Sequence, residues 1–283
     1  MKKLYRDFQT IYGLNHLCPL CGKVKEVICR TAIGDDLAED WRLSPELRRA
    51  FDYREGCSCR HCGATTRIMN LALTLLEVIN LNNSTGYQFA ADVDWQSLTA
   101  LRLAEINNCG VLHDYLGNLA GLSYSEYGSA DPAIRSEDLR RLSYEDNCFD
   151  IVLTSDVLEH VPDYRLALHE ISRVLKPDGV FILTVPWLRH RKTVVKAKID
   201  HQGMVELLSK ASYHGDYNLR LTDYLVFYEF GYDFVQDLQN IFAVEIYCHH
   251  GFGGLITSVF VCRGRAPGND LTPGRPRPTA LSR

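Results

Sequence analysis

The feature that most constrains the fold of this chain is an alternation of strand-like and helix-like runs that begins near residue 98. The strand-like runs read ALRLAEI, LSYSEY, IRSEDL, FDIVLTS and VFILTVP, and the helical runs read VLHDYLGNLAGL and YRLALHEISRVL. Such alternation predicts βαβ units. In the second helix Tyr164, Leu168, Ile171 and Leu175 share one face, as expected where a helix covers a sheet. We therefore expect an α/β fold with a doubly wound, mostly parallel sheet.

The end of this pattern predicts a turn and the closing elements. Pro177, Asp178 and Gly179 should turn the chain into a strand over 180–185. Further on, GYDFVQDLQNIF has the character of a helix, and FAVEIY and LITSVFVC have the character of two closing strands.

Changes in composition divide the chain into parts. Residues 1–67 form a cysteine-rich head, and residues 68–97, which contain the helically spaced run IMNLALTLLEVI, form a helical linker. The α/β domain spans 98–265 and carries a substrate insertion over 187–230, rich in Tyr, His, Arg and Lys, which we expect over the sheet edge. The proline-rich tail over 266–283 is predicted to be disordered.

Two C-x-x-C-G knuckles mark the head. Cys18 with Cys21 and Cys59 with Cys62 each place two thiolates on a tight turn, and together they predict a four-sulfur, zinc-ribbon-like site for structural Zn(II). Unligated surface thiols and an iron–sulfur cluster are the weaker alternatives. Cys57 and His61 lie close enough to replace a ligand, and Cys29 matches no pair. Four protein ligands leave the ion no open position, so we expect no catalytic role for it.

The net charge of −4 gives no overall attraction to nucleic acid or to anionic lipid. No apolar run is long enough for a secretory signal or a membrane span. We therefore expect a cytoplasmic protein. In that compartment the ten cysteines are not expected to form a disulfide framework. We expect the partner to be a small molecule. A homodimer stays open.

Acidic residues stand at or just after three successive strands, where an open parallel sheet binds ligands. Glu105 ends the first run, Glu126 ends the second, and Asp138 follows the third. Glu126 is suited to accept both ribose hydroxyls of an adenosine, while Asp138 could accept from an adenine amino group beside the Leu139 amide. A helix cap or a surface carboxylate is the alternative for each acid.

Residues 136–186 resemble the second half of class I S-adenosylmethionine-dependent methyltransferases of the type 11 group. The resemblance is carried by Asp138 four residues before Leu142, by Phe149-Asp150 at a strand start, by Leu-Glu-His-Val at 158–161, and by RVLKPDG. It implies a seven-stranded, Rossmann-like sheet and methyl transfer. The head, with Arg54-Glu55-Gly56, CRHCG and Arg67, is similar to a bacterial subgroup that carries a cysteine-rich, zinc-binding segment before this domain.

The resemblance also implies a cofactor site and shows one departure. It implies adenine near Asp138 and Leu139, ribose on Glu126, and the methionine part across the first turn. The family has alternating glycines at that turn, whereas this chain reads Glu-Ile-Asn-Asn-Cys-Gly over 105–110. Asn tolerates positive φ and can substitute in part for glycine. The expected cofactor-binding residues are Glu105, Asn107, Gly110, Glu126, Tyr127, Asp138, Leu139 and Ser155.

Methyl transfer needs alignment and, for a hydroxyl or a protonated amine, a base. The candidate bases are His160 and His214, each with a purely structural role as its alternative. Asp156, Glu159 and His160 form an alternative divalent-cation cluster. We expect an O- or N-methyltransferase of a small acceptor, such as a sugar or a secondary-metabolism intermediate. The rivals are a noncatalytic scaffold and, third, a nucleic-acid methyltransferase.

Overall fold

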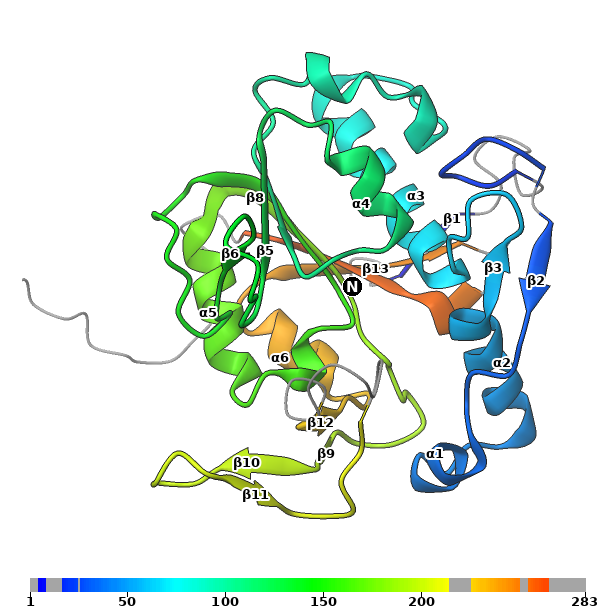
Figure 1. Cartoon of the computed structure of the whole chain (residues 1–283), viewed down its shortest axis with the longest axis vertical. Coiled ribbons are helices and arrows are strands. Elements are labelled where there is room, and N and C mark those ends of the chain that lie inside the picture. The colour runs from blue at the N-terminus through cyan, green and yellow to red at the C-terminus, as the bar shows by residue number, and fades with distance from the viewer. Residues whose placement is uncertain (1–4, 9–16, 25, 214–224, 250–253, 265–283) are drawn as a thin grey trace, which may run out of the picture.

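The computed structural model describes residues 5–8, 17–24, 26–213, 225–249 and 254–264 (Figure 1). The tail at 266–283, which is predicted to be disordered, therefore lies outside the described residues. So does the candidate base His214. The helices are α1 (Asp35–Asp40), α2 (Pro45–Gly56), α3 (Thr66–Asn83), α4 (Val111–Leu116), α5 (Tyr164–Val174) and α6 (Phe234–Gln239), with short 3-10 helices η1 (Ala90–Asp92), η2 (Trp95–Ser97), η3 (Leu158–His160) and η5 (Gly254–Thr257).

The strands that the structure describes form one large sheet and three small ones. The large sheet has the order β1-β13-β14-β8-β7-β4-β5-β6. The strands are β1 (Tyr5–Phe8), β2 (Val27–Cys29), β3 (Cys57–Cys59), β4 (Leu103–Ile106), β5 (Leu122–Glu126), β6 (Arg135–Ser136), β7 (Phe149–Ser155), β8 (Leu175–Thr184), β9 (Val194–Val195), β10 (Ala197–Ile199), β11 (Val205–Leu207), β12 (Tyr228–Glu229), β13 (Ala243–His249) and β14 (Val259–Arg263).

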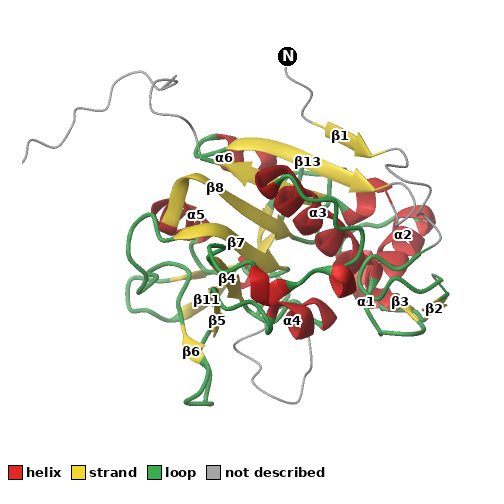
Figure 2. Cartoon of the chain, turned by 90° about the horizontal axis from the view of Figure 1, so that it is seen from above, coloured by secondary structure: helices red, strands yellow, loops and turns green. Residues whose placement is uncertain are grey.

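The doubly wound, mostly parallel α/β sheet is confirmed. β4, β5, β6, β7 and β8 run parallel to one another, and β14 runs antiparallel to both β8 and β13. The seven expected strands are joined by an eighth, β1, which pairs in parallel with β13 and lies alongside it in Figure 2. Residues 5–8 thus belong to the central sheet, not to the head.

The prediction of a turn at Pro177–Gly179 is wrong. β8 begins at Leu175 and runs through these residues to Thr184. In its pairing with β7, Phe149 lies opposite Leu175, while Ile151 lies opposite Val180, so the extra residues are taken up by an irregularity in the register. A bulge of this kind lets a strand absorb a Pro-Asp-Gly sequence without ending.

Alternate residues of the central strands face two hydrophobic cores. Val152 and Leu183 point into a core covered by α5 and α6, whereas Leu153 and Ile182 point into a core covered by α3 and α4. The segment expected as a helical linker is largely α3, and its Leu71, Leu75 and Val78 are completely buried in the second core. The helix is therefore part of the domain core and does not act as a free connection.

The head packs on the same core. Cys18, Leu20 and Cys59 belong to the cluster that contains α3 and the sheet residues Leu153 and Ile182. α2 is capped by Ser44, whose side chain accepts a hydrogen bond from the amide of Leu47. The head and the sheet therefore share buried surface instead of forming two independent bodies.

The sequence predicted that the ten cysteines are not a disulfide framework, and eight are free, but one pair that was not expected is bonded. β2 and β3 are antiparallel, and Cys29 lies directly opposite Cys57. The two residues form a disulfide. Sequence spacing could not indicate this pair, because the two cysteines are 28 positions apart and the segment between them includes α1 and α2.

The insertion at 187–230 leaves the sheet after β8 and forms two small antiparallel pairs, β9 with β12 and β10 with β11. Figure 1 shows the β10–β11 hairpin next to the β9–β12 pair, away from the outer strands β1 and β6. The backbone amide of Phe227 donates to the carbonyl of Glu159 at 2.8 Å. This contact ties the insertion to the segment after β7.

Gly56 offers a test of the head's packing. A Cβ at this position would lie 2.0 Å from the carbonyl oxygen of Arg30 in the chain segment after β2. We expect Gly56→Ala to lower the free energy of unfolding by about 1–3 kcal/mol, measured by chemical denaturation. Gly86→Ala is the matched control, since nothing lies within 4 Å of its added Cβ. Equal stability of the two variants would contradict the close approach.

Candidate active site

A cavity of about 1220 Å³ lies beyond the carboxyl ends of β4 and β7, where the residues Ile106 and Ser155 form part of its wall. This is the position at which an open parallel sheet binds ligands. The head contributes residues between Ala32 and Trp41 to the wall, and the insertion contributes Ile199, Val205 and Phe227. One cavity is thus built by all three parts of the chain.

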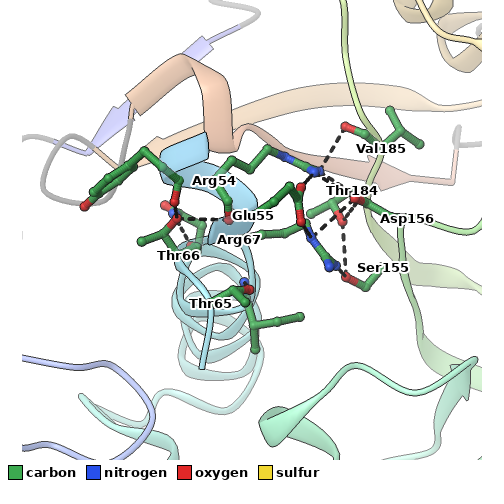
Figure 3. A network of polar contacts seen from close by, with 12 residues as sticks. Arg54, Glu55, Thr65, Thr66, Arg67, Ser155, Asp156, Thr184 and Val185 are labelled. Carbon is green, nitrogen blue, oxygen red and sulfur yellow. Dashed lines mark hydrogen bonds and ion pairs between the residues drawn. The ribbon is translucent and has the colours of Figure 1, made fainter. Parts of the chain in front are cut away.

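A buried ion-pair network joins the head to the sheet at this cavity (Figure 3). Arg54, at the end of α2, makes two hydrogen bonds of 2.7 Å to the two carboxylate oxygens of Asp156, and a third of 3.1 Å to the carbonyl of Val185. Arg67, from α3, bonds Glu55 at 3.1 Å, lies 3.3 Å from Asp156, and donates to the hydroxyl of Ser155. Arg54 is 1% exposed.

The charges of this network fix the protonation of Asp156. Burial would raise the pKa of Asp156, but the positive charges of Arg54 and Arg67 and a 2.7 Å hydrogen bond from Thr184 outweigh burial and lower the pKa to about 2. Because the native pKa lies below the unfolded value, the stability that Asp156 contributes is present at neutral pH. It is lost as the pH falls below about 4 towards 2.

The first turn after β4 keeps its shape without the usual glycines. Asn107 has φ of 62°, a conformation that Asn adopts more readily than most residues, and it lines the cavity. Glu105 is fully buried and does not line the cavity; it accepts hydrogen bonds from the amide of Cys109 at 2.8 Å and from His113 at 2.7 Å. Gly110, at φ of 61°, packs towards Ile68. Glu105 therefore stabilises the turn from the side that faces away from the cavity.

The residues expected around an adenosine divide into two groups. Tyr127, Asp138, Leu139 and Ser155 line the cavity. Glu126 does not; it accepts a hydrogen bond from the hydroxyl of Tyr124. The carboxylate of Asp138 is held by Arg140, which donates to it at 2.7 Å. The individual roles of these residues stay predictions.

The wall of the cavity also contains Glu159 and His160, both in the 3-10 helix η3. His160 lies with Nδ1 3.1 Å from the carbonyl oxygen of Leu225 and with Nε2 3.9 Å from Glu159. Glu159 is 1% exposed, and neither of its oxygens has a hydrogen-bond partner among the residues that the structure describes. Burial, and next the charge of Asp156, raise the pKa of Glu159 well above its ordinary value.

The alternative of a divalent cation at Asp156, Glu159 and His160 gains no support. Both oxygens of Asp156 are bonded to Arg54, whose positive charge opposes a second cation there. Within the described part of the chain, the one group of ligand-type side chains close enough to share an ion is Cys18, Cys21, Cys59 and Cys62.

The four knuckle cysteines do come together. The Sγ atoms of Cys18 and Cys62 are 3.7 Å apart, those of Cys21 and Cys59 are 4.0 Å apart, and all four lie within 4.8 Å of one another. The hydrogen bond that the neutral Cys18 thiol makes with Cys62, and next burial, raise the pKa of the Cys18 thiol. Zn–S bonds of about 2.3 Å in a tetrahedron place sulfurs about 3.8 Å apart, so the spacing fits the ion.

A second buried network, which no sequence motif indicated, ties α1 to the insertion. Lys196 is 2% exposed and lies 2.6 Å from Asp40, which lines the cavity, and 3.4 Å from Glu229. Arg191 pairs with Glu229 and donates to the carbonyl of Asp40 at 3.1 Å. The signal that could have indicated both networks is charge at positions flanked by apolar residues, as at Arg67 before Ile68 and at Lys196 after Val195.

Comparison with known proteins agrees with this geometry. Residues 109–183 match the model of the family described as "Methyltransferase domain". Over these residues the chain is similar to a methyltransferase domain. The matched segment includes β5, β7, α5 and most of β8.

Curated relatives and solved structures give shorter or weaker likenesses to this methyltransferase domain. Demethylmenaquinone methyltransferases of Staphylococcus haemolyticus and Staphylococcus aureus are each 49% identical over 45 residues, which is 16% of this chain and only 19% of theirs. A S-adenosylmethionine-dependent methyltransferase from Mesorhizobium loti has a TM-score of 0.34 and 16% identity, covering 62% of this chain and all of its own. Phosphoethanolamine N-methyltransferase 2 from Haemonchus contortus, solved with S-adenosylmethionine, has a TM-score of 0.25 and 19% identity, covering 36% and 26%.

None of the described helices has the length and apolar character that crossing a membrane requires.

The Arg54–Asp156 pair can be tested by removing one partner. Arg54→Met leaves the Asp156 carboxylate with Arg67 as its remaining cation, and we expect a loss of about 3 kcal/mol in the free energy of unfolding at neutral pH. Arg49→Met is the control on the same helix, because Arg49 is 69% exposed in its pair with Glu46. It should cost less than about 1 kcal/mol in the same denaturation experiment. Similar losses of unfolding free energy in both variants would show that the buried Arg54–Asp156 pair contributes no more to stability than an exposed pair does.

Proposed function

We propose that the chain is an S-adenosylmethionine-dependent methyltransferase that methylates a small-molecule acceptor and carries a structural zinc ion in its head. The observation that supports this most is the single cavity, which begins at the carboxyl ends of β4 and β7 and continues between the head and the insertion. A volume of about 1220 Å³ has room for a nucleoside cofactor together with a second small molecule.

The residues that line the sheet side of the cavity fit the parts of the cofactor. Asp138 and Leu139 offer an acceptor and a backbone amide for adenine, and Tyr127 offers an exposed ring on the same wall. The carboxylate of the cofactor's methionine part needs hydrogen-bond donors. Arg67, whose side chain is 19% exposed, offers a guanidinium group on the same wall as Asn107 and Ser155. The Glu126 carboxylate would become available to ribose by releasing the hydroxyl of Tyr124.

The chemistry that the cofactor supplies is a methyl group on a sulfonium, and the protein's part is to align the acceptor and to exclude water. Head residues Ile33 and Trp41 and the insertion residue Phe227 are all buried, and they line the acceptor side of the cavity. The noncatalytic alternative shares this cavity but requires no cofactor binding. The finer assignment, an O- or N-methyltransferase of a sugar or secondary-metabolism intermediate in the cytoplasm, rests on this proposal.

Cofactor binding is tested directly with S-adenosylhomocysteine by calorimetry. We expect the wild-type protein to bind, and Asn107→Gly to bind within about twofold of wild type, because Gly also adopts positive φ. Asn107→Val should bind about tenfold more weakly, since a β-branched residue at φ of 62° costs about 1–2 kcal/mol. Absence of binding by the wild-type protein would favour the scaffold. Equal affinity of the Asn107→Val and Asn107→Gly variants for S-adenosylhomocysteine would show that the first turn is not part of the cofactor site.

The zinc site is tested by metal analysis of the purified protein. We expect about one zinc ion per chain and no visible iron–sulfur absorption. Cys21→Ser should lose the zinc and lower the unfolding temperature, because three thiolates hold the ion less tightly than four. Cys148→Ser is the control, since Cys148 is a free, partly buried cysteine outside the cluster. Zinc retained in full by the Cys21 variant would contradict the assigned ligands.

A further inference from the structure

We propose that Glu159 binds the hydroxyl group of the acceptor and takes its proton during methyl transfer, and that the acceptor is a neutral alcohol or phenol with an apolar body. This inference rests on the proposed function. It assigns the acceptor chemistry to a residue that lies outside the cofactor wall.

The first observation is an unsatisfied buried carboxyl group. Glu159 is 1% exposed, lines the cavity, and has no hydrogen-bond partner for either oxygen among the described residues. By contrast, the buried Glu105 accepts two hydrogen bonds, and Asp156 is bonded by Arg54 and Thr184. A buried polar group without a partner costs free energy, so the fold retains Glu159 in a state that a bound donor would relieve.

The second observation is the charge balance around this carboxyl group. Arg54 and Arg67 carry two positive charges, and Glu55 and Asp156 carry two negative ones, so the network beside Glu159 is neutral. An ionised Glu159 adds one negative charge, which the sulfonium of the cofactor would balance. A neutral hydroxyl keeps this balance, whereas an ammonium group would add an uncompensated positive charge in a buried site.

The third observation is the orientation of His160. Its Nδ1 lies 3.1 Å from the carbonyl oxygen of Leu225, which in the neutral ring places the proton on Nδ1 and makes Nε2 an acceptor. Nε2 is 3.9 Å from Glu159 and faces it. His160 therefore lies beside the carboxyl group as a positioning residue, with an acceptor nitrogen turned towards it.

The apolar walls define the rest of the acceptor. Val157, Val161 and Phe227 are buried beside η3, and Ile199 and Val205 of the hairpin are 37% and 47% exposed on the outer side of the cavity. These side chains offer no hydrogen bonds to a polyhydroxylated molecule. They favour an aliphatic or aromatic body that carries one hydroxyl.

The step balances in atoms and charge. The acceptor oxygen forms a bond to the methyl carbon, the carbon–sulfur bond breaks with its electron pair left on sulfur, and the hydroxyl proton moves to the Glu159 carboxylate. The sulfonium and the carboxylate each lose their charge. The products are a methyl ether, a neutral thioether and a protonated Glu159, so the cavity is neutral when the products leave.

The test uses 4-propylphenol as the acceptor probe and three relatives: 4-propylanisole, which cannot donate, 4-propylbenzylamine, which is cationic, and 4-propylbenzoate, which is anionic. Binding is measured by calorimetry with sinefungin, a cofactor analogue with an ammonium in place of the sulfonium. We expect the phenol to bind at least about tenfold more tightly than each relative. Glu159→Gln should abolish this preference, and Glu206→Gln, on the exposed hairpin, should retain it.

Methyl transfer from S-adenosylmethionine to the phenol should fall about 100-fold or more in Glu159→Gln, with S-adenosylhomocysteine affinity unchanged and the pH dependence of the remaining rate flattened. A tighter-bound amine, or full turnover by Glu159→Gln, would overturn the proposal. Failure of the wild-type protein to bind S-adenosylhomocysteine would instead overturn the proposed function, so the two failures are distinct.

A stability readout checks the state of Glu159 without turnover. The groups that face it are Asp156, Arg54, Arg67 and His160. Because its native pKa lies above the unfolded value of about 4.3, the wild-type protein should lose stability relative to Glu159→Gln as the pH rises above that value. Both proteins keep His160, so the difference between them reports Glu159 alone. Parallel curves of unfolding temperature against pH would show a solvated, ordinary carboxyl group and contradict the proposal.

Discussion

The paired hydrogen bonds between Arg54 and Asp156 are the contact on which the site depends. Arg54 comes from the end of a head helix, and Asp156 follows the central strand β7, so one ion pair joins residues 102 positions apart. Since each charge is costly to bury alone, the helix end and the strand end must stay together. Asp156 adopts φ of 52° at this junction, which turns the chain from β7 into η3, where Glu159 and His160 lie.

The four-cysteine cluster is connected to the cavity through this junction. Cys59 ends β3, and the chain then passes through Cys62 into α3, whose Thr66 donates to the carbonyl of Tyr53 at 2.5 Å. The next residue, Arg67, reaches Ser155 in the cavity wall. A metal that holds the knuckles thereby fixes the start of α3 and the end of α2 in one piece. Thus a structural ion can influence cofactor binding without touching a ligand.

The sequence allowed the parallel sheet, α5, α3 and the four-cysteine cluster to be predicted, because each rests on a local period or spacing. It did not indicate β1, whose pairing with β13 joins residues more than two hundred positions apart. The Cys29–Cys57 pair depends on the register of a hairpin closed by two helices. Arg54 and Arg67 were visible as charged residues near Cys59, but their partners lie on β7 and beyond. Charge pairing at long range leaves no periodic trace.

The two buried networks explain why Glu159 differs from its neighbours. Glu229 forms ion pairs with Lys196 and Arg191, and Asp156 forms an ion pair with Arg54. Each of these two acids therefore has at least one cation beside it. Glu159 lines the cavity, and its backbone carbonyl accepts a hydrogen bond from the amide of Phe227. Unlike Glu229 and Asp156, it has no hydrogen-bond partner for either carboxyl oxygen among the described residues. This difference supports the proposal that Glu159 takes the proton of the acceptor.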